Sequence, residues 1–285
     1  MSAPRLLILD GNVASIRAKL DAAVGYDSGT GYARMLKRLD PSLECEILRA
    51  ADGPVALPGG AAIADYDGCV MTGSALNVYD GGAAIMRQID LVKAILTIGI
   101  PFFGSCWGLQ VATVAAGGRV EANTLGREFG FGRRIALTDA GRRHPLFAGK
   151  PDVFEAPTIH RDVVTTLPIG ATVLATNEMG LQAAAFTFAN SEVWGVQYHP
   201  EYDYIDIAAV ARRYGTALVT DGTFADAHSL EQYAVELEQL QRDPANTALN
   251  FRHGLGPGMT NEHLRRLEIS NWLQVMVTPR ARRHV

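Results

Sequence analysis

Short apolar runs alternate with amphipathic segments along the first part of the chain. Four compact runs are rich in Val, Ile, Leu and Phe and have Gly, Pro or Asp close by: residues 5–10, 44–49, 69–72 and 101–104. Such runs are typical of strands that are buried on both faces of a parallel sheet. The pattern therefore predicts parallel strands at these four positions.

Helical spacing fills the segments between these runs, at residues 32–39, 83–98 and 109–116. In the second of them, Ile85, Ile89 and Val92 fall on one stripe of a helix. Strands that alternate with helices are typical of βαβ units. We therefore predict an α/β fold with an open, mostly parallel, flavodoxin-like sheet and helices on both faces.

The second half of the chain changes character twice. It becomes strand-rich from about residue 131, with runs at 134–137, 172–175, 182–188 and 193–197, and a helix is predicted over 205–219. Beyond residue 220 come a charged amphipathic helix over 230–240, a Gly-rich passage and a helical pattern over 262–277. We expect a main domain over residues 1–220 and a helical C-terminal extension over 221–285.

Two features of this extension have simple structural explanations. The glycines at 254, 256 and 258 follow no buried strand and precede no Gly-Lys-Ser/Thr sequence, so they indicate a plain loop and not a phosphate-binding loop. Trp272 lies in an apolar stretch of the last helical pattern. We expect it to anchor the C-terminal helix.

Composition and charge exclude several classes of partner. The 285 residues are 48% hydrophobic and 20% charged, with a net charge of -4 and a pI near 6.0. These values give no electrostatic reason to expect binding to nucleic acid or to a membrane surface. Only four apolar residues, Leu6 to Leu9, precede Asp10, and no apolar run approaches a membrane span.

The three cysteines, Cys45, Cys69 and Cys106, form no even disulfide framework. We therefore expect a reducing compartment and a cytoplasmic protein. Cys45 and Cys69 lie in apolar strand patterns without His or acidic neighbours at metal-ligand spacing. They are interpreted as structural thiols, and neither a metal nor a cofactor is expected.

Cys106 is different because it lies in the turn of the segment Pro101–Gln110, which reads as a buried strand, a Gly-x-Cys-x-Gly turn and the start of a helix. Such a turn exposes one side chain at the end of a strand in an unfavourable backbone conformation, and Gly104 and Gly108 remove the Cβ atoms that would block it. A thiol at a helix N-terminus is favoured in its nucleophilic thiolate form. Cys106 is therefore the candidate nucleophile.

A cysteine nucleophile needs a base, and the base needs an orienting partner. His199 directly follows the apolar strand over 193–197, so it is expected at the same sheet edge as Cys106. Glu201, two residues on, can hydrogen-bond the second imidazole nitrogen and fix its tautomer. The sequence therefore predicts a Cys106–His199–Glu201 triad. A papain-like site is rejected, because Phe103 replaces that family's cysteine and His199 follows too closely.

The segments around these residues resemble the class I, or triad-type, glutamine amidotransferases. Gly104–Gln110 and Gly195–Glu201 resemble the two signature blocks of that family. Three further segments, Gly117–Ala122, Arg127–Gly130 and His160–Val164, are similar to the amidotransferase domain of GMP synthase. The resemblance covers roughly residues 5–219.

The resemblance implies roles for further residues. Backbone N–H groups of Gly73 and Trp107 would hold the oxyanion that forms when Cys106 attacks a glutamine carboxamide. Gln110 matches a family position that contacts the substrate glutamine, and Arg161 and Asp162 match a loop whose backbone does the same. The oxyanion segment departs from the family pattern, because it reads Gly73-Ser74-Ala75 where Gly-Gly-Pro or Gly-Pro-Gly is usual.

The chain carries no match to the ATP pyrophosphatase loop of GMP synthase and no P-loop. The favoured hypothesis is a glutaminase that hydrolyses glutamine and releases ammonia for a separate synthase subunit. The extension is expected to pack on the core, with homo-oligomerisation or partner docking as the alternatives. The alternative is a stand-alone cysteine hydrolase of a γ-glutamyl amide or peptide. A third hypothesis, a non-catalytic binding module, is disfavoured by the intact Cys106, His199 and Glu201.

Overall fold

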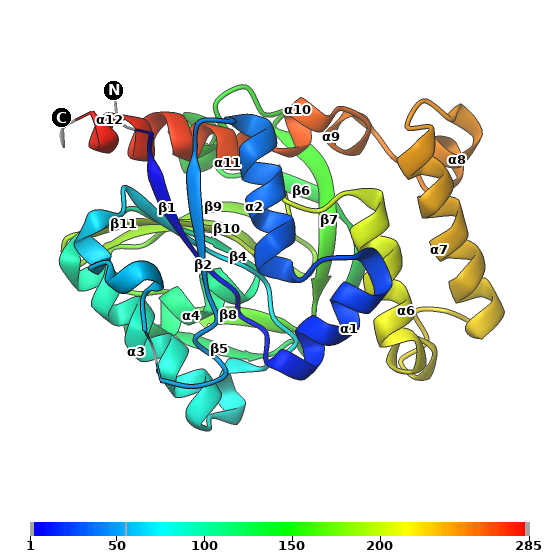
Figure 1. Ribbon diagram of the computed structural model, residues 1–285. Coiled ribbons are helices and arrows are strands. Elements are labelled where there is room, and N and C mark those ends of the chain that lie inside the picture. Colours follow the sequence, from blue (N-terminus) through cyan, green and yellow to red (C-terminus); the bar gives the residue numbers. More distant parts are fainter. Residues whose placement is uncertain (1–2, 55, 283–285) are drawn as a thin grey trace.

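The computed structural model describes residues 3–54 and 56–282, and a nine-stranded sheet runs through its centre (Figure 1). The strand order is β2-β1-β3-β4-β11-β10-β9-β6-β7, and β5 and β8 form a separate two-stranded sheet. The strands are β1 (Arg5–Leu9), β2 (Glu44–Leu48), β3 (Gly68–Met71), β4 (Phe102–Ser105), β5 (Arg119–Ala122), β6 (Glu128–Leu137), β7 (Val153–His160), β8 (Asp162–Thr166), β9 (Thr172–Asn177), β10 (Gly180–Phe188) and β11 (Ser191–Val196).

Twelve α-helices accompany the strands in the described residues, together with short 3-10 helices. They are α1 (Ala14–Val24), α2 (Ser28–Leu39), α3 (Ala83–Ile98), α4 (Trp107–Ala115), α5 (Asp139–Arg143), α6 (Tyr204–Thr220), α7 (Ala227–Arg242), α8 (Thr247–Arg252), α9 (Pro257–Thr260), α10 (Glu262–Arg265), α11 (Leu267–Trp272) and α12 (Thr278–Ala281). A π-helix, Leu273–Val277, joins the last two.

The first five strands in the sheet order, from β2 to β11, are all parallel, and the remaining four continue the sheet antiparallel. In the parallel part Met71 pairs with Gly104, and Gly104 pairs with Gly195. The carboxyl ends of β3, β4 and β11 therefore lie at one edge, where ligands gather in open α/β sheets. The predicted α/β fold is confirmed.

Helices cover both faces of the parallel strands, as predicted. Along β1, Leu6 and Ile8 face a core that includes residues of α2 and α11, whereas Leu7 and Leu9 face a core that includes residues of α3 and α4. Successive side chains of a strand point to opposite faces, so a strand covered on both sides must be apolar throughout. This explains the unbroken apolar run at residues 5–9.

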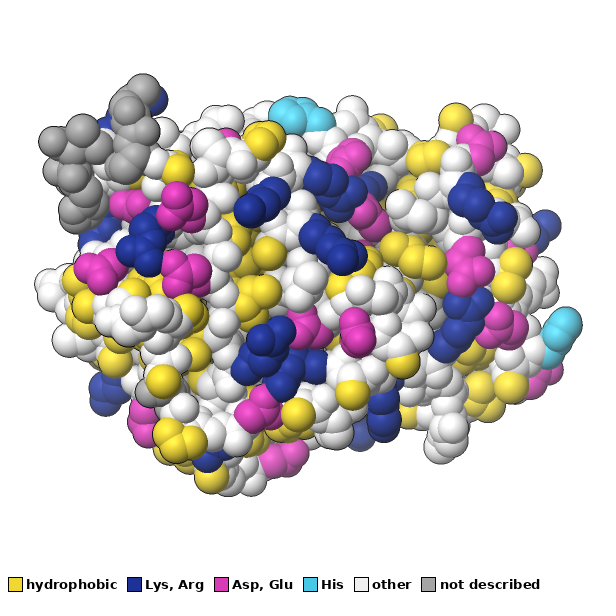
Figure 2. Space-filling view, viewed as in Figure 1, with side chains coloured by type: hydrophobic (Ala, Val, Ile, Leu, Met, Phe, Trp, Pro, Cys, Tyr) yellow, Lys and Arg dark blue, Asp and Glu magenta, His cyan; other side chains and the backbone are white. Residues whose placement is uncertain are grey.

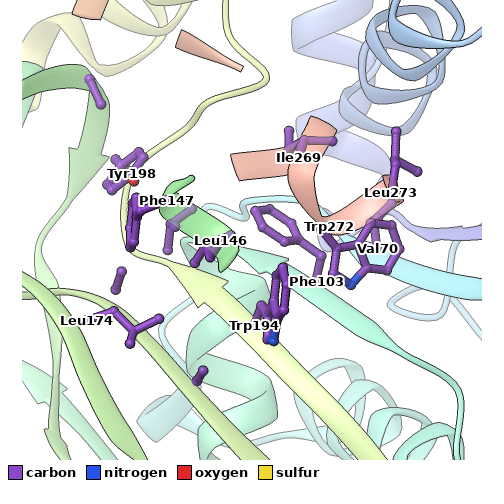
Figure 3. Packing of buried hydrophobic residues seen from close by; sticks show 14 of the residues in the cluster. Val70, Phe103, Leu146, Phe147, Leu174, Trp194, Tyr198, Ile269, Trp272 and Leu273 are labelled. Carbon is purple, nitrogen blue, oxygen red and sulfur yellow. The ribbon is translucent and has the colours of Figure 1, made fainter. Parts of the chain in front are cut away.

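The C-terminal helices share the first of these cores. Figure 3 shows Trp272 beside Phe103 and Val70 of the sheet, and Ile269 belongs to the same buried cluster. The rings of Trp272 and Phe103 lie 5.9 Å apart, and Trp272 is completely buried. A Cβ on Gly68 would lie 2.8 Å from the Trp272 ring, so this glycine leaves room for the indole. The expectation that Trp272 anchors this segment is confirmed, whereas the division of the chain at residue 220 stays a prediction.

Several elements differ from the expected ones. The pattern over 262–277 folds as α10, α11 and a π-helix and not as one helix, because the backbone leaves helical geometry at Arg266 (φ -108°, ψ 8°). Helix α1 and strands β5, β7 and β8 are not predicted, because apolar residues do not recur at regular helix or strand spacing in their sequences. The glycine passage is a loop up to Gly256, as predicted, whereas Gly258 lies in α9. The N–H of Gly256 donates to the carboxylate of Glu155.

Across residues 3–54 and 56–282, no helix is long and apolar enough to cross a membrane. The same residues contain no group of three or more His, Cys, Asp or Glu side chains that could hold a metal ion. Cys69 is buried and Cys45 is half-buried, and burial raises the pKa of the Cys45 thiol to about 11.

A buried ion pair fastens the extension to the main sheet. The ammonium of Lys150 lies 2.9 Å from Glu268 of α11, and both side chains are fully buried. The hydroxyl of Tyr198 donates to the same carboxylate. The extension is therefore tied to the segment that follows β11.

Replacing Lys150 with methionine should leave the Glu268 charge buried without its cation. We expect the free energy of unfolding to fall by about 3–5 kcal/mol, measured by urea denaturation. Lys93→Met, at an exposed position, is the control and should change it by less than about 0.5 kcal/mol. Equal stabilities of the two variants would contradict this role of the pair.

Candidate active site

Cys106 occupies a sharp turn between β4 and α4. Its backbone has φ 51° and ψ -100°, and its N–H donates to the carbonyl of Val196 at the end of β11 over 2.8 Å. A positive φ is unfavourable for any residue with a Cβ, and it persists only where the surroundings enforce it. The turn that the sequence predicts is therefore present, and Cys106 is only 5% exposed.

The two glycines of this turn are required by close packing. A Cβ on Gly104 would lie 2.4 Å from the backbone of Gly108 and Leu109, and one on Gly108 would lie 2.5 Å from the carbonyl oxygen of Met71. These separations are shorter than real Cβ contacts allow. Gly104 and Gly108 let the start of α4 lie directly on the ends of β3 and β4.

His199 and Glu201 lie together at the same edge. The Nδ1 of His199 lies 2.8 Å from Oε1 of Glu201, and both side chains are at least nine-tenths buried. Burial lowers the pKa of His199, but the Glu201 charge and the hydrogen bond to Cys106 outweigh it and raise this pKa to about 10. The imidazole is therefore held in its protonated form at neutral pH.

The thiol of Cys106 has two partners. Its sulfur lies 3.7 Å from the carbonyl oxygen of Ile159, near the end of β7, and its hydrogen bond with the imidazole helps to raise the pKa of His199. The backbone N–H of His199 in turn donates to Pro157 of the same strand over 2.8 Å. All three residues of the predicted triad are thus brought together, with β7 bordering them.

The predicted oxyanion donors flank this group. Trp107 begins α4, and its indole N–H donates to Gln88 over 3.0 Å. Gly73 follows β3 and lies against the imidazole, since a Cβ there would be 2.4 Å from Cε1 of His199. Trp107 thus directly follows Cys106 and Gly73 lies against His199, and their role as oxyanion donors stays a prediction.

Asn12 holds the Gly73 segment in place, and the sequence analysis did not single it out. Its side-chain amide donates to the carbonyl of Gly73 over 3.3 Å, and its side-chain oxygen accepts from the N–H of Ala75 over 3.0 Å. The hydroxyl of Ser74 donates to Gly11 over 2.8 Å. Ser74 and Asn12 thus fasten the segment where the family's usual glycine and proline are missing.

The predicted substrate-binding residues fall into two groups. Gln110 is 2% exposed, and its amide donates to Gln197 over 3.3 Å, so it is not a surface residue of α4. Asp162 is buried and accepts from the hydroxyl of Tyr79 over 2.8 Å. The side chain of Arg161 is exposed and its carbonyl accepts from Asn123, so this carbonyl already has a protein partner.

Two further residues shape the site. The ring of Tyr202 stacks on the imidazole of His199, with centroids 4.1 Å apart and planes 9° from parallel. Asp203 accepts from Arg265 over 2.8 Å and from Arg266 over 2.5 Å, and both arginines belong to the C-terminal extension. Tyr202 could have been predicted as a site residue, because it directly follows the His199-Pro200-Glu201 sequence. The pairing of Asp203 with two distant arginines could not, because no local pattern in the sequence indicates it.

Gly73→Ala should damage the site directly. The added methyl group must displace the imidazole of His199 or the oxyanion segment, and a displacement of about 1 Å costs on the order of 10²-fold in rate. Gly53→Ala is the matched control, since nothing lies within 4 Å of its added Cβ. Steady-state kinetics compare the two variants. Equal kcat values would show that catalysis does not depend on the close contact between Gly73 and His199.

Comparison with known proteins identifies the family of this chain. Residues 27–205 match the family model of the class-I glutamine amidotransferases. A γ-glutamyl-L-1-hydroxyisopropylamide hydrolase of a Pseudomonas species is 35% identical over 284 residues, which span 98% of this chain and 95% of that protein. A glutamine-hydrolysing GMP synthase of Thermomicrobium roseum is 30% identical over 73% of this chain, but the match spans only 37% of the synthase.

Solved structures share the fold at low sequence identity. A glutamine amidotransferase from Thermotoga maritima superposes with a TM-score of 0.67 and 19% identity, covering 98% of this chain and all of that one. Another from Methylobacillus flagellatus gives 0.60 and 18%, covering 95% and 96% of the two chains. With the family match over residues 27–205, these findings establish that the chain belongs to the class-I glutamine amidotransferases, a family of carbon–nitrogen amide-hydrolysing enzymes.

Proposed function

We propose that this protein hydrolyses the γ-amide bond of γ-glutamyl derivatives of small amines, without a synthase partner. The observation that carries the proposal is the extent of similarity to the γ-glutamyl-L-1-hydroxyisopropylamide hydrolase, which spans 98% of this chain and therefore includes the C-terminal extension. The family model, by contrast, ends at residue 205. The matched span thus covers the positions of Arg265, Arg266 and Glu268, which contact the segment around His199.

In the proposed mechanism Cys106 is the nucleophile. Its thiolate attacks the γ-carbonyl carbon, and the negative oxygen that forms is held by the N–H groups of Gly73 and Trp107. The carbon–nitrogen bond breaks as His199, protonated at neutral pH, gives its Nε2 proton to the departing amine. A γ-glutamyl thioester on Cys106 and a free amine result.

Water completes the reaction. The imidazole of His199, now neutral, takes a proton from a water molecule, which attacks the thioester carbonyl. The carbon–sulfur bond breaks, and glutamate leaves as the Cys106–His199 ion pair is restored. Glu201 holds Nδ1 of His199 throughout over 2.8 Å. We expect the substrate's glutamyl group to bind near Gln110 and the Arg161–Asp162 segment. Amide and water thus give glutamate and an amine.

A second candidate function is the release of ammonia from glutamine for a synthase subunit. The similarity to GMP synthase supports it, because that match includes the segment of Cys106, but it spans 37% of the synthase. The two functions use the same residues and differ in the leaving group. Glutamine loses ammonia, whereas the γ-glutamyl amide loses a substituted amine.

The test compares two substrates with the purified full-length chain. We expect kcat/KM for γ-glutamyl isopropylamide to exceed that for glutamine by about tenfold or more, since a few buried methyl groups contribute this much. Glutamate release measures both reactions. A tenfold preference for glutamine, or hydrolysis that starts only when a synthase is added, would support the second candidate and contradict our proposal.

A further inference from the structure

A cavity of about 270 Å³ lies between α1, α2 and α6, on the face of the molecule shown in Figure 2. Arg34, Arg38 and Gln241 are exposed residues at its rim, and basic and acidic side chains gather over α2 in that view. Its volume is at the lower end of the roughly 300–1,000 Å³ of small-molecule sites. It therefore suits a fragment of a few heavy atoms and not a peptide.

The inner end of the cavity borders the predicted triad. Gly73, Glu201 and Tyr202 all line it. Tyr202 stacks on the imidazole of His199, and a Cβ on Gly73 would lie 3.3 Å from its Nε2 atom. Nε2 is the atom that delivers the proton to the departing amine in the proposed mechanism. The cavity thus reaches the predicted triad at Glu201 and at the Gly73 side of the His199 imidazole.

One buried acceptor at this end lacks a protein partner. Glu201 uses Oε1 for His199, but its Oε2 atom is buried and has no hydrogen-bond partner among the residues described. A buried carboxylate oxygen without a donor is costly. Asp206 also lines the cavity, and both of its oxygens are engaged, by the hydroxyl of Tyr26 and the N–H of Asp203. The end of the cavity therefore offers negative charge.

The side walls are aromatic and aliphatic. Tyr26, Tyr32 and Tyr202 line the cavity, and Arg34 already stacks over the Tyr26 ring, 4.8 Å from its centroid. Five aliphatic residues also line it: Leu20, Val24, Ile205, Ala209 and Val210. Carboxylates repel an anion, whereas an unpaired carboxylate oxygen among aromatic rings and methyl groups matches an alkylammonium ion.

We infer that this cavity receives the amine half of the substrate, and that it selects γ-glutamyl amides of short aliphatic primary amines. The inference deepens the proposed function and rests on it. The alkyl group would pack against Val24 and Val210, and the nitrogen would lie beside Nε2 of His199. As the carbon–nitrogen bond breaks, the amine takes the Nε2 proton, and the ammonium ion that forms then moves to the end of the cavity that Glu201 lines.

The test fills the cavity from two sides. Val210→Phe on α6 and Val24→Phe on α1 reduce its volume, and Val235→Phe, at a position on α7 outside the cavity, is the matched control. The measured quantity is the ratio of kcat/KM for γ-glutamyl isopropylamide to that for glutamine. We expect the ratio to fall about tenfold or more in the first two variants and to stay at the wild-type value in the control. Thermal unfolding confirms that each variant is folded.

A ratio within twofold of wild type in both folded cavity variants overturns the inference and leaves the proposed function intact. If the wild type hydrolyses neither amide, the proposed function fails and the cavity is tested by binding alone. Calorimetry then uses isopropylamine, which is an ammonium ion at neutral pH, with 2-propanol as its uncharged counterpart. Binding of the amine alone, lost in Val210→Phe, supports the site; equal binding of the two compounds, or no binding, overturns it.

Discussion

Cys106→Ala is expected to lower kcat/KM for amide hydrolysis by about 10⁴-fold or more, because the variant has no thiol beside His199 to attack the amide carbon. The strained backbone at Cys106, with φ 51°, presents the thiol to His199 and to the predicted oxyanion donors at once. Alanine can keep the fold but cannot form a thioester. Glutamate release from γ-glutamyl isopropylamide and from glutamine measures the loss.

Cys45→Ala is the matched control for this variant. Cys45 is half-buried in β2, and burial raises its pKa to about 11, so its thiol stays protonated and takes no part in the reaction. Its removal should leave both activities within about twofold. A Cys106→Ala protein that is folded and fully active would show that the nucleophile lies elsewhere.

Glu201→Gln is expected to reduce kcat by about 10³–10⁴-fold and to change its dependence on pH. Glutamine keeps the size of the side chain but removes the charge that holds the pKa of His199 at about 10. Burial lowers the pKa of His199, and in the variant the Glu201 charge no longer opposes this effect, so the pKa falls. The alkaline limb of the kcat/KM profile should therefore lie near pH 10 in the wild type and at lower pH in the variant.

The same shift links stability to pH. Because the pKa of His199 is higher in the folded protein than the ordinary value of 6.5, protonation stabilises the fold fully below pH 6.5. This stabilisation is lost as the pH rises through about 10. Unfolding by urea at several pH values measures it, and Glu201→Gln should flatten the loss. An unchanged alkaline limb in both experiments would contradict the role given to Glu201.

The parts of the site that the sequence predicted are those built from local patterns. Gly104, Cys106 and Gly108 lie within one turn, and a buried strand on one side and a helix on the other are visible in the sequence. His199 and Glu201 are two residues apart, so one rule about strand ends places both. Their proximity to Cys106 follows from the parallel pairing of β4 and β11, which the fold class implies.

The parts that could not be predicted depend on pairing between distant segments. Asn12 supports Gly73 across 61 residues of sequence, and Asp203 receives Arg265 and Arg266 across 62 and 63. No local period or spacing encodes such contacts. Asn12 follows the first strand, so the rule that placed His199 at a strand end applies to it as well. Its position at the sheet edge was therefore visible in the sequence, whereas its contact with Gly73 was not.

The C-terminal extension shows the same limit. Its helical pattern was visible, but its place against the sheet depends on Trp272 entering the space above Gly68 and on Lys150 meeting Glu268. These contacts also explain why the extension matters for the function proposed here. Glu268 of the extension binds Tyr198, and Arg265 binds Asp203. The extension therefore holds both ends of the segment that carries His199 and Glu201.

The central claim is that Cys106 carries the γ-glutamyl group during hydrolysis of a substituted amide. Acid-quenched mixtures of the enzyme with γ-glutamyl isopropylamide, analysed by peptide mass spectrometry, test it most directly. We predict one γ-glutamyl group on the peptide that contains Cys106, formed together with free isopropylamine and absent in Cys106→Ala. Amine release without any adduct on Cys106, at a rate that Cys106→Ala retains, would contradict the account.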